Sequence, residues 1–288
     1  MNKITSITGV LLAALTLGGC ASNETTITIG HNNYAESVAF AHLWKTVLED
    51  QGYQVELSLV EKAMLFNGVE NGDIDIGFNT WLPFTDQAYV SLDSEEIDVQ
   101  ADGVLYEGTT LGLAVPSYMD DVETIEDLAG YFDELKGTIT GIDPGSALMQ
   151  LTQAEAYEVI DHYSLEEFTL QSSSEQAMIA ELDARYKNEE PIVVTLWSPH
   201  WTFGSYDLKF LEDPDRIYGE ADDIYYMARN GLAEDEPDLI HWLNNCHFTE
   251  ETLSELLTLQ QQYEDDIDGA VAEWIEKHED LVHAWLEG

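Results

Sequence analysis

The sequence predicts an α/β fold of two lobes, each a mostly parallel sheet flanked by helices. Three observations indicate this fold. Short strand-like segments alternate with helical segments from residue 26 to residue 78, the same order restarts near residue 138, and the chain after residue 235 is helical. Because strand–helix–strand units form parallel sheets, two such series in succession predict two sheets.

Turn residues bound the elements of the first series. Val38, Ala41 and Trp44 recur at the spacing of one helical face, and Gly52 follows the end of that helix. Asn71-Gly72 is a turn signal before a strand. In chain order, the first series is expected to contain strand 26–29, helix 35–50, strand 55–60, helix 63–70 and strand 74–78.

The second series repeats the pattern and ends in a fully apolar strand. It is expected to contain strand 138–142, helix 146–160, strand 168–170, helix 174–187 and strand 192–196. Two extended segments, 110–115 and 224–228, are placed to cross between the lobes. We assign the helical tail to the first lobe, which therefore comprises 26–109 plus 228–288, with 110–227 as an inserted second lobe.

The first twenty residues predict a bacterial lipoprotein signal. A lysine precedes an apolar stretch, and Leu17-Gly18-Gly19-Cys20 matches the pattern at which such signals are cleaved and the cysteine is acylated. We therefore expect 1–19 to be removed, Cys20 to be lipidated and 20–25 to be a linker. The protein would then lie outside the cytoplasm, anchored to a membrane at the cell surface or in the periplasm. The alternative is an ordinary secretory peptide.

The chain is strongly acidic, with 57 Asp and Glu against 10 Lys and Arg and a formal net charge of −47. This charge excludes nucleic acid as a partner. The carboxylates are dispersed among 7 Trp and 14 Tyr, so they belong to the surface of a folded protein and indicate a medium of high salt or high pH. The alternative, specific cation binding, lacks a cluster with ligand spacing, and neither a metal nor a cofactor is expected.

The sequence does not predict an enzyme. It contains no Gly-x-Ser-x-Gly elbow and no His-Glu-x-x-His motif, and the only cysteine besides Cys20 is Cys246. Once Cys20 is lipidated, no intrachain disulfide can form. A sensor that binds the same ligand is a weaker alternative, because the sequence has no apolar run long enough to span a membrane after the signal.

Three aromatic residues mark a candidate binding site. In open sheets of this kind, ligands bind beyond the carboxyl ends of the strands. Tyr34, Trp81 and Trp197 come shortly after predicted strands of both lobes. Aromatic faces hold quaternary ammonium ions, which cannot donate hydrogen bonds, through cation–π attraction. The alternative for each aromatic is burial in a core.

The segment Gly141-Ile142-Asp143-Pro144-Gly145-Ser146 predicts a strand, a tight turn and the start of a helix. Free backbone N–H groups in such a turn can hold an anion, for example a carboxylate. The alternative is a plain connecting turn.

Several motifs together resemble one transport family. They are Gly72-Asp73, Asn79-Thr80-Trp81-Leu82-Pro83, 111–116, Gly141-Ile142-Asp143-Pro144-Gly145, 191–201 with Trp197-Ser198-Pro199-His200-Trp201, and 208–214. Over nearly the whole chain after the signal, they are similar to the glycine betaine/proline betaine substrate-binding proteins of ABC transporters. The resemblance implies a two-lobed periplasmic-binding-protein (type II) fold with the ligand in the inter-lobe cleft. It also implies capture of a quaternary-ammonium solute, glycine betaine first and proline betaine next, for delivery to an ABC permease by a monomeric protein.

The resemblance implies roles for individual residues. Trp81 and Trp197 would be two walls of an aromatic cage, and Tyr34 stands where the family often has a third Trp. Gly141 and Ile142 would donate backbone N–H groups to a ligand carboxylate.

One departure from the family concerns Asp86. Related betaine binders often carry a His here that contacts the ligand carboxylate. An ionised Asp86 would repel a carboxylate but favour a hydroxyl or a bare cation. This shifts weight toward choline or trimethylamine N-oxide, or toward a betaine held by a different carboxylate clamp. The same fold specialised for choline, carnitine or trimethylamine N-oxide is kept as an alternative to a betaine binder. The alternative is that Asp86 caps a helix or faces solvent.

Overall fold

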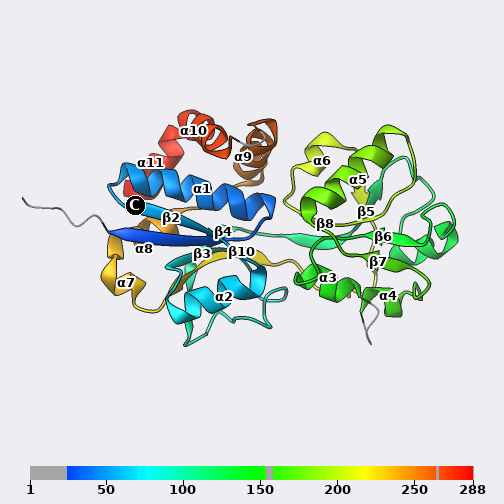
Figure 1. Ribbon diagram of the computed structural model, residues 1–288, viewed down its shortest axis with the longest axis horizontal. Helices are drawn as coiled ribbons and strands as arrows, with labels where there is room; N and C mark the ends of the chain where they lie inside the picture. Colours follow the sequence, from blue (N-terminus) through cyan, green and yellow to red (C-terminus); the bar gives the residue numbers. More distant parts are fainter. Residues whose placement is uncertain (1–24, 154–157, 264–265, 288) are drawn as a thin grey trace, which may run out of the picture.

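A computed structural model describes residues 25–153, 158–263 and 266–287, and it consists of two lobes that each contain a five-stranded sheet (Figure 1). The predicted signal and Cys20 lie outside the described residues. No helix of the described part is long and apolar enough to cross a membrane.

In the first lobe, a parallel half and an antiparallel half share one sheet. The strand order is β2-β1-β3-β10-β4, in which β1 is parallel to β2 and β3, whereas β10 is antiparallel to β3 and β4. The strands are β1 Thr26–His31, β2 Gln54–Leu59, β3 Ile76–Leu82, β4 Ile97–Tyr106 and β10 Asp223–Arg229.

Helices cover both faces of this first sheet. Helix α1 (Ala35–Asp50) and helix α2 (Lys62–Asn71) lie on opposite sides of it (Figure 1). The tail packs on α1 and β4 of this lobe. Its helices are α7 Leu232–Asp235, α8 Pro237–Asn245, α9 Glu250–Tyr263, α10 Ile267–Lys277 and α11 Glu279–Glu287.

The second lobe repeats this design with strand order β7-β6-β8-β5-β9. Strand β6 is parallel to β7 and β8, and β5 is antiparallel to β8 and β9. The strands are β5 Thr110–Pro116, β6 Thr138–Thr140, β7 Thr169–Gln171, β8 Val194–Ser198 and β9 Leu208–Phe210. The helices are the 3₁₀ helix η1 Ile125–Tyr131, α3 Ala147–Thr152, α4 Val159–His162, α5 Glu175–Lys187 and α6 Thr202–Ser205.

Two lobes of α/β type are therefore confirmed, but each sheet is mixed because antiparallel strands complete it. The two segments expected to cross between the lobes instead belong to β5 and β10. Strand β10 carries a buried Ile224-Tyr225-Tyr226-Met227-Ala228 run between β3 and β4, so it completes the first sheet. The expected boundary between residues 227 and 228 falls inside this strand and must move to its start.

The crossings themselves are two connections that hydrogen-bond to each other. One lies between β4 and β5, and the other leads from β9 to β10. The Thr109 N–H donates to the Asp222 carbonyl oxygen at 2.8 Å, and the Gly108 N–H donates to Asp223 Oδ1 at 2.9 Å. The two lobes are thus joined at a narrow, hydrogen-bonded hinge.

Tryptophans on helical faces form part of the first lobe's core. Trp44 of α1 is fully buried and stacks on Trp285, which in turn stacks on Trp274. These three rings hold the tail helices against α1, and aromatic pairs of this kind contribute about 0.5 to 1.5 kcal/mol each beyond their burial.

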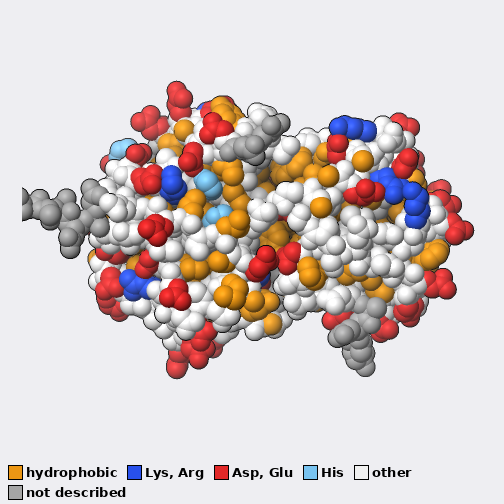
Figure 2. All heavy atoms as spheres, in the orientation of Figure 1, with side chains coloured by type: hydrophobic (Ala, Val, Ile, Leu, Met, Phe, Trp, Pro, Cys, Tyr) orange, Lys and Arg blue, Asp and Glu red, His pale blue; other side chains and the backbone are white. Residues whose placement is uncertain are grey.

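Acidic side chains lie scattered over both lobes on the visible surface, with few Lys and Arg between them (Figure 2). They form no single patch. Among the described residues, no group of three or more His, Cys, Asp and Glu is arranged to hold a metal ion.

Candidate functional site

A cavity of about 40 Å³ lies between the two lobes. It has room for about three water molecules at roughly 10 to 15 Å³ each, so it fits a small solute only closely. Tyr34, Trp81 and Trp197, predicted as a binding site, are among the residues that line it. The full lining is Tyr34, Glu36, Lys62, Asn79, Trp81, Thr85, Asp86, Leu111, Ile142, Ser146, Ala147, Leu148 and Trp197.

The aromatic walls come from both lobes. Trp81 and Trp197 are buried, at 4% and 3% exposure, and they lie inside β3 and β8 and not beyond them as expected. Both strands are longer than predicted at this end. Each ends just before a proline with a cis peptide bond, Pro83 or Pro199. The Tyr34 ring meets the Trp197 ring edge-on across the cleft, with centroids 5.8 Å apart.

Side-chain contacts hold two of these rings. Tyr34 precedes α1, and its hydroxyl donates to Asp143 of the second lobe. The Trp81 Nε1–H donates to the Asn79 side chain, and Asn79 adopts a left-handed backbone conformation with φ of 80°. The indole N–H is therefore satisfied within the wall, which leaves the ring to serve the cavity as an apolar, electron-rich surface.

Further hydrogen bonds join the lobes beside the cavity. The Trp197 Nε1–H of β8 donates to Glu36 Oε2 of α1 at 3.1 Å. The Ala35 N–H, in the first turn of α1, donates to Glu175 Oε2 of α5 at 3.1 Å. The lobes are therefore closed on each other in this structure.

Glu36 is a cavity residue that the sequence did not single out. It is 1% exposed, and burial, followed by the charge of Glu175, raises its pKa to about 8. Glu175 in turn contacts His200 Nε2 at 3.2 Å. The only sequence signal was a Glu in the first turn of a helix two residues after the candidate Tyr34, which many surface helices share.

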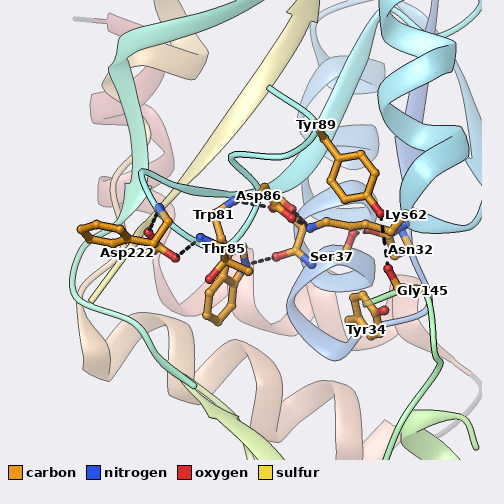
Figure 3. A network of polar contacts seen from close by, with 12 residues as sticks. Asn32, Tyr34, Ser37, Lys62, Trp81, Thr85, Asp86, Tyr89, Gly145 and Asp222 are labelled. Atoms are coloured by element: carbon orange, nitrogen blue, oxygen red, sulfur yellow. Dashed lines mark hydrogen bonds and ion pairs between the residues drawn. The ribbon is translucent and has the colours of Figure 1, made fainter. Parts of the chain in front are cut away.

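Asp86 is fully buried, so the alternative that it caps a helix end or faces solvent is wrong. Its Oδ2 pairs with Lys62 Nζ at 2.8 Å and accepts the Trp81 N–H at 2.8 Å (Figure 3). Burial raises the pKa of Asp86, while the Lys62 charge opposes that rise. Lys62 was also missed, because a Lys at the start of a helix is ordinarily a surface residue.

Gly141 is not among the cavity residues. Its N–H donates to the Gln171 carbonyl oxygen at 2.9 Å, which extends the pairing of β6 with β7. A Cβ at this position would lie 2.7 Å from Met149 Cε, so the end of the Met149 side chain would have to move if another residue replaced this glycine. This corrects the expectation that the Gly141 amide faces a ligand, whereas Ile142 does line the cavity.

Two hinged α/β lobes that close on a small aromatic cavity define the class of solute-binding proteins. Within that class, the chain belongs to the family described as the substrate-binding domain of ABC-type glycine betaine transport systems, which matches residues 25–277. Members of this family are extracytoplasmic substrate-binding proteins of transport systems and not enzymes.

Individual relatives agree with this assignment. The chain is 40% identical over 158 residues to the glycine betaine/carnitine transport binding protein of Listeria monocytogenes, a match of 54% of this chain and 51% of that protein. The chain thus matches about half the length of that relative. The Borrelia burgdorferi glycine betaine, L-proline-binding protein superposes with a TM-score of 0.83 at 31% identity, over 91% of this chain and 96% of that one. Lactococcal OpuAC, closed on glycine betaine, gives 0.81 at 29% identity, over 91% and 100%.

Proposed function

We propose that the protein captures a quaternary-ammonium compatible solute in the cavity, glycine betaine first and proline betaine next, and delivers it to an ABC permease. The observation that carries this proposal is the set of three aromatic rings, Tyr34, Trp81 and Trp197, that wall one small cavity from both lobes. A quaternary ammonium ion offers no N–H for a hydrogen bond, so ring faces are its natural partners, at about 0.5 to 2 kcal/mol per contact.

The charges around the cavity also suit a cation. Two carboxyl groups, Glu36 and Asp86, and one ammonium group, Lys62, line it. Because Lys62 neutralises Asp86, the protonation state of Glu36 decides the net charge of the cavity lining. A bound cation favours the ionised form of Glu36, so the cavity can supply a full negative charge when the ligand arrives.

The hinge supplies the mechanism of capture. When the lobes are apart, Trp197 and Ile142 of the second lobe lie away from the first lobe. The rings of Tyr34 and Trp81 are then exposed to solvent. Closure about the paired crossings brings Trp197 against Tyr34 and buries the ligand. The closed arrangement of both lobes is the form that a permease would recognise.

Calorimetric titration of the mature protein with glycine betaine in high-salt buffer tests the proposal. One-to-one binding without turnover is expected. W81A and W197A should each weaken binding about tenfold or more, since both cation–π attraction and apolar burial are lost. W242A is the matched control, because Trp242 packs against Tyr53 and does not line the cavity. If W81A and W197A bind like the wild type, the aromatic rings do not form the ligand site.

The same fold specialised for choline, carnitine or trimethylamine N-oxide is the second candidate, and the buried Asp86 favours it. An osmolyte sensor would bind the same ligands. A strain that lacks this protein separates the two roles, since it loses solute uptake only if the protein serves transport.

The lipid anchor at Cys20 belongs to this proposal as well. A tethered binding protein stays close to its permease. Labelling of growing cells with a fatty acid should mark the wild type and not C20A. A labelled C20A protein would refute the anchor.

A further inference from the structure

One oxygen of Asp86 is buried without a hydrogen-bond partner. Asp86 Oδ2 has two donors, Lys62 Nζ and the Trp81 N–H, but Oδ1 has none among the described residues. The residue is 0% exposed. A buried acceptor left unpaired costs free energy, so nearly all such groups in native proteins have a partner.

The unpaired oxygen belongs to a side chain that is held firmly at the cavity wall. Lys62 is fixed in turn because its Nζ also donates to the Asn79 carbonyl oxygen at 2.6 Å. The other nearby carboxylate, Asp222, is occupied by the Phe84 and Thr85 N–H groups at 2.6 and 2.9 Å. The protein thus anchors one side of the Asp86 carboxylate (Figure 3), and the side chain is one of those that line the cavity.

We propose that Asp86 Oδ1 accepts a hydrogen bond from a hydroxyl group of the ligand, so that the site selects quaternary ammonium compounds with a hydroxyl-bearing arm. This inference rests on the proposed function, because the cationic head still occupies the aromatic walls. It adds the identity of the polar end of the ligand, which the rings do not determine, and it thereby ranks choline, the second candidate of the proposed function, ahead of glycine betaine.

The chemistry of the alternatives supports a hydroxyl group. A ligand carboxylate has no hydrogen to donate, so it would leave Oδ1 unpaired. A quaternary ammonium nitrogen has no N–H either, so a ligand without a polar arm leaves Oδ1 unpaired. A hydroxyl group satisfies it, and hydrogen bonds to ionised acceptors are the stronger kind.

Two ligands that differ only at this group test the proposal. Choline carries a terminal hydroxyl, and propyltrimethylammonium has a methyl group in its place. Wild-type protein should bind choline about tenfold or more tightly than propyltrimethylammonium in calorimetric titrations. Glycine betaine is the third ligand, and it should bind more weakly than choline.

The matched variants remove the Lys62–Asp86 ion pair as a unit, because removal of one partner would leave a buried charge. K62M/D86L should abolish the advantage of choline over propyltrimethylammonium. K62M/D86N keeps an acceptor for the Trp81 N–H, and it replaces K62M/D86L in the same titrations if that variant does not fold. K209M/E123Q, which removes the ion pair of Lys209 with Glu123 away from the cavity, should keep the advantage.

The outcomes separate this inference from the proposed function. If propyltrimethylammonium binds but choline has no advantage, or if both ion-pair variants keep that advantage, Asp86 does not accept a ligand hydroxyl. Glycine betaine binding more tightly than choline to wild-type protein would also overturn the inference. If none of the three ligands binds, the proposed function is refuted, and the inference about Asp86 is refuted with it.

Discussion

Glu36 should make the stability of the closed protein depend on pH. Burial, followed by the charge of Glu175, raises its pKa from 4.5 to about 8. The unfolded chain has the ordinary pKa, so between these two values the folded protein keeps a proton that the unfolded chain releases. The stability that protonated Glu36 contributes is therefore fully present below about pH 4.5 and is lost progressively as the pH rises to about 8.

The magnitude follows from the size of the pKa difference. The difference between a pKa of 4.5 and a pKa of about 8 corresponds to about 5 kcal/mol in the free energy of unfolding, at roughly 1.4 kcal/mol for each pKa unit. This is an upper limit, because the lobes can separate and let water reach the carboxylate. For a chain of this length, the loss of this free energy lowers Tm by about 10 °C.

Thermal unfolding of E36Q at constant salt between pH 5 and pH 9 measures this contribution. Glutamine keeps an acceptor for the Trp197 indole but does not titrate. The Tm advantage of E36Q over the wild type should grow as the pH rises. E49Q is the control, because Glu49 is an exposed residue of the same helix, and it should follow the wild type. Parallel curves for E36Q and the wild type would refute the reasoning.

Three further substitutions test the walls of the cavity. K62M alone should lower the free energy of unfolding by about 3 to 5 kcal/mol, because Asp86 stays buried without its counter-charge, and chemical denaturation measures this. N79A should lower the free energy of unfolding by about 1 to 2 kcal/mol, since alanine is strained in the left-handed backbone region and the Trp81 indole loses its acceptor. N79G should recover the share of this loss that comes from backbone strain. Y34F keeps the ring but loses the hydroxyl that reaches the second lobe, so solute should dissociate several-fold faster in stopped-flow experiments while W81A shows the larger loss.

The sequence predicted the elements that depend on local pattern. The helix over 35–50 has those bounds in the structure, because an apolar face and a following Gly52 define it locally. Strands β4 and β9 were missed, since an edge strand with polar residues such as Asp98 and Asp102 shows no clear alternation. The expected helix 146–160 consists instead of α3 and α4, with residues 154–157 outside the described part.

The candidate site was predicted only in part for a similar reason. Aromatic residues at strand ends were visible in the sequence, and Tyr34, Trp81 and Trp197 do line one cavity. Glu36 and Lys62 were not visible as site residues, because a charged residue on a helix is ordinarily exposed. Only the packing of both lobes around them buries these charges.

Asp222 links the hinge to the ligand cavity through a single residue. Its carbonyl oxygen accepts the Thr109 N–H of the other crossing, and its carboxylate accepts the N–H groups of Phe84 and Thr85. Asp86, which lines the cavity, is the next residue after Thr85. A rotation of the second lobe about the paired crossings therefore acts at a residue that also holds the backbone just before Asp86, which gives the hinge a direct path to the polar wall of the cavity.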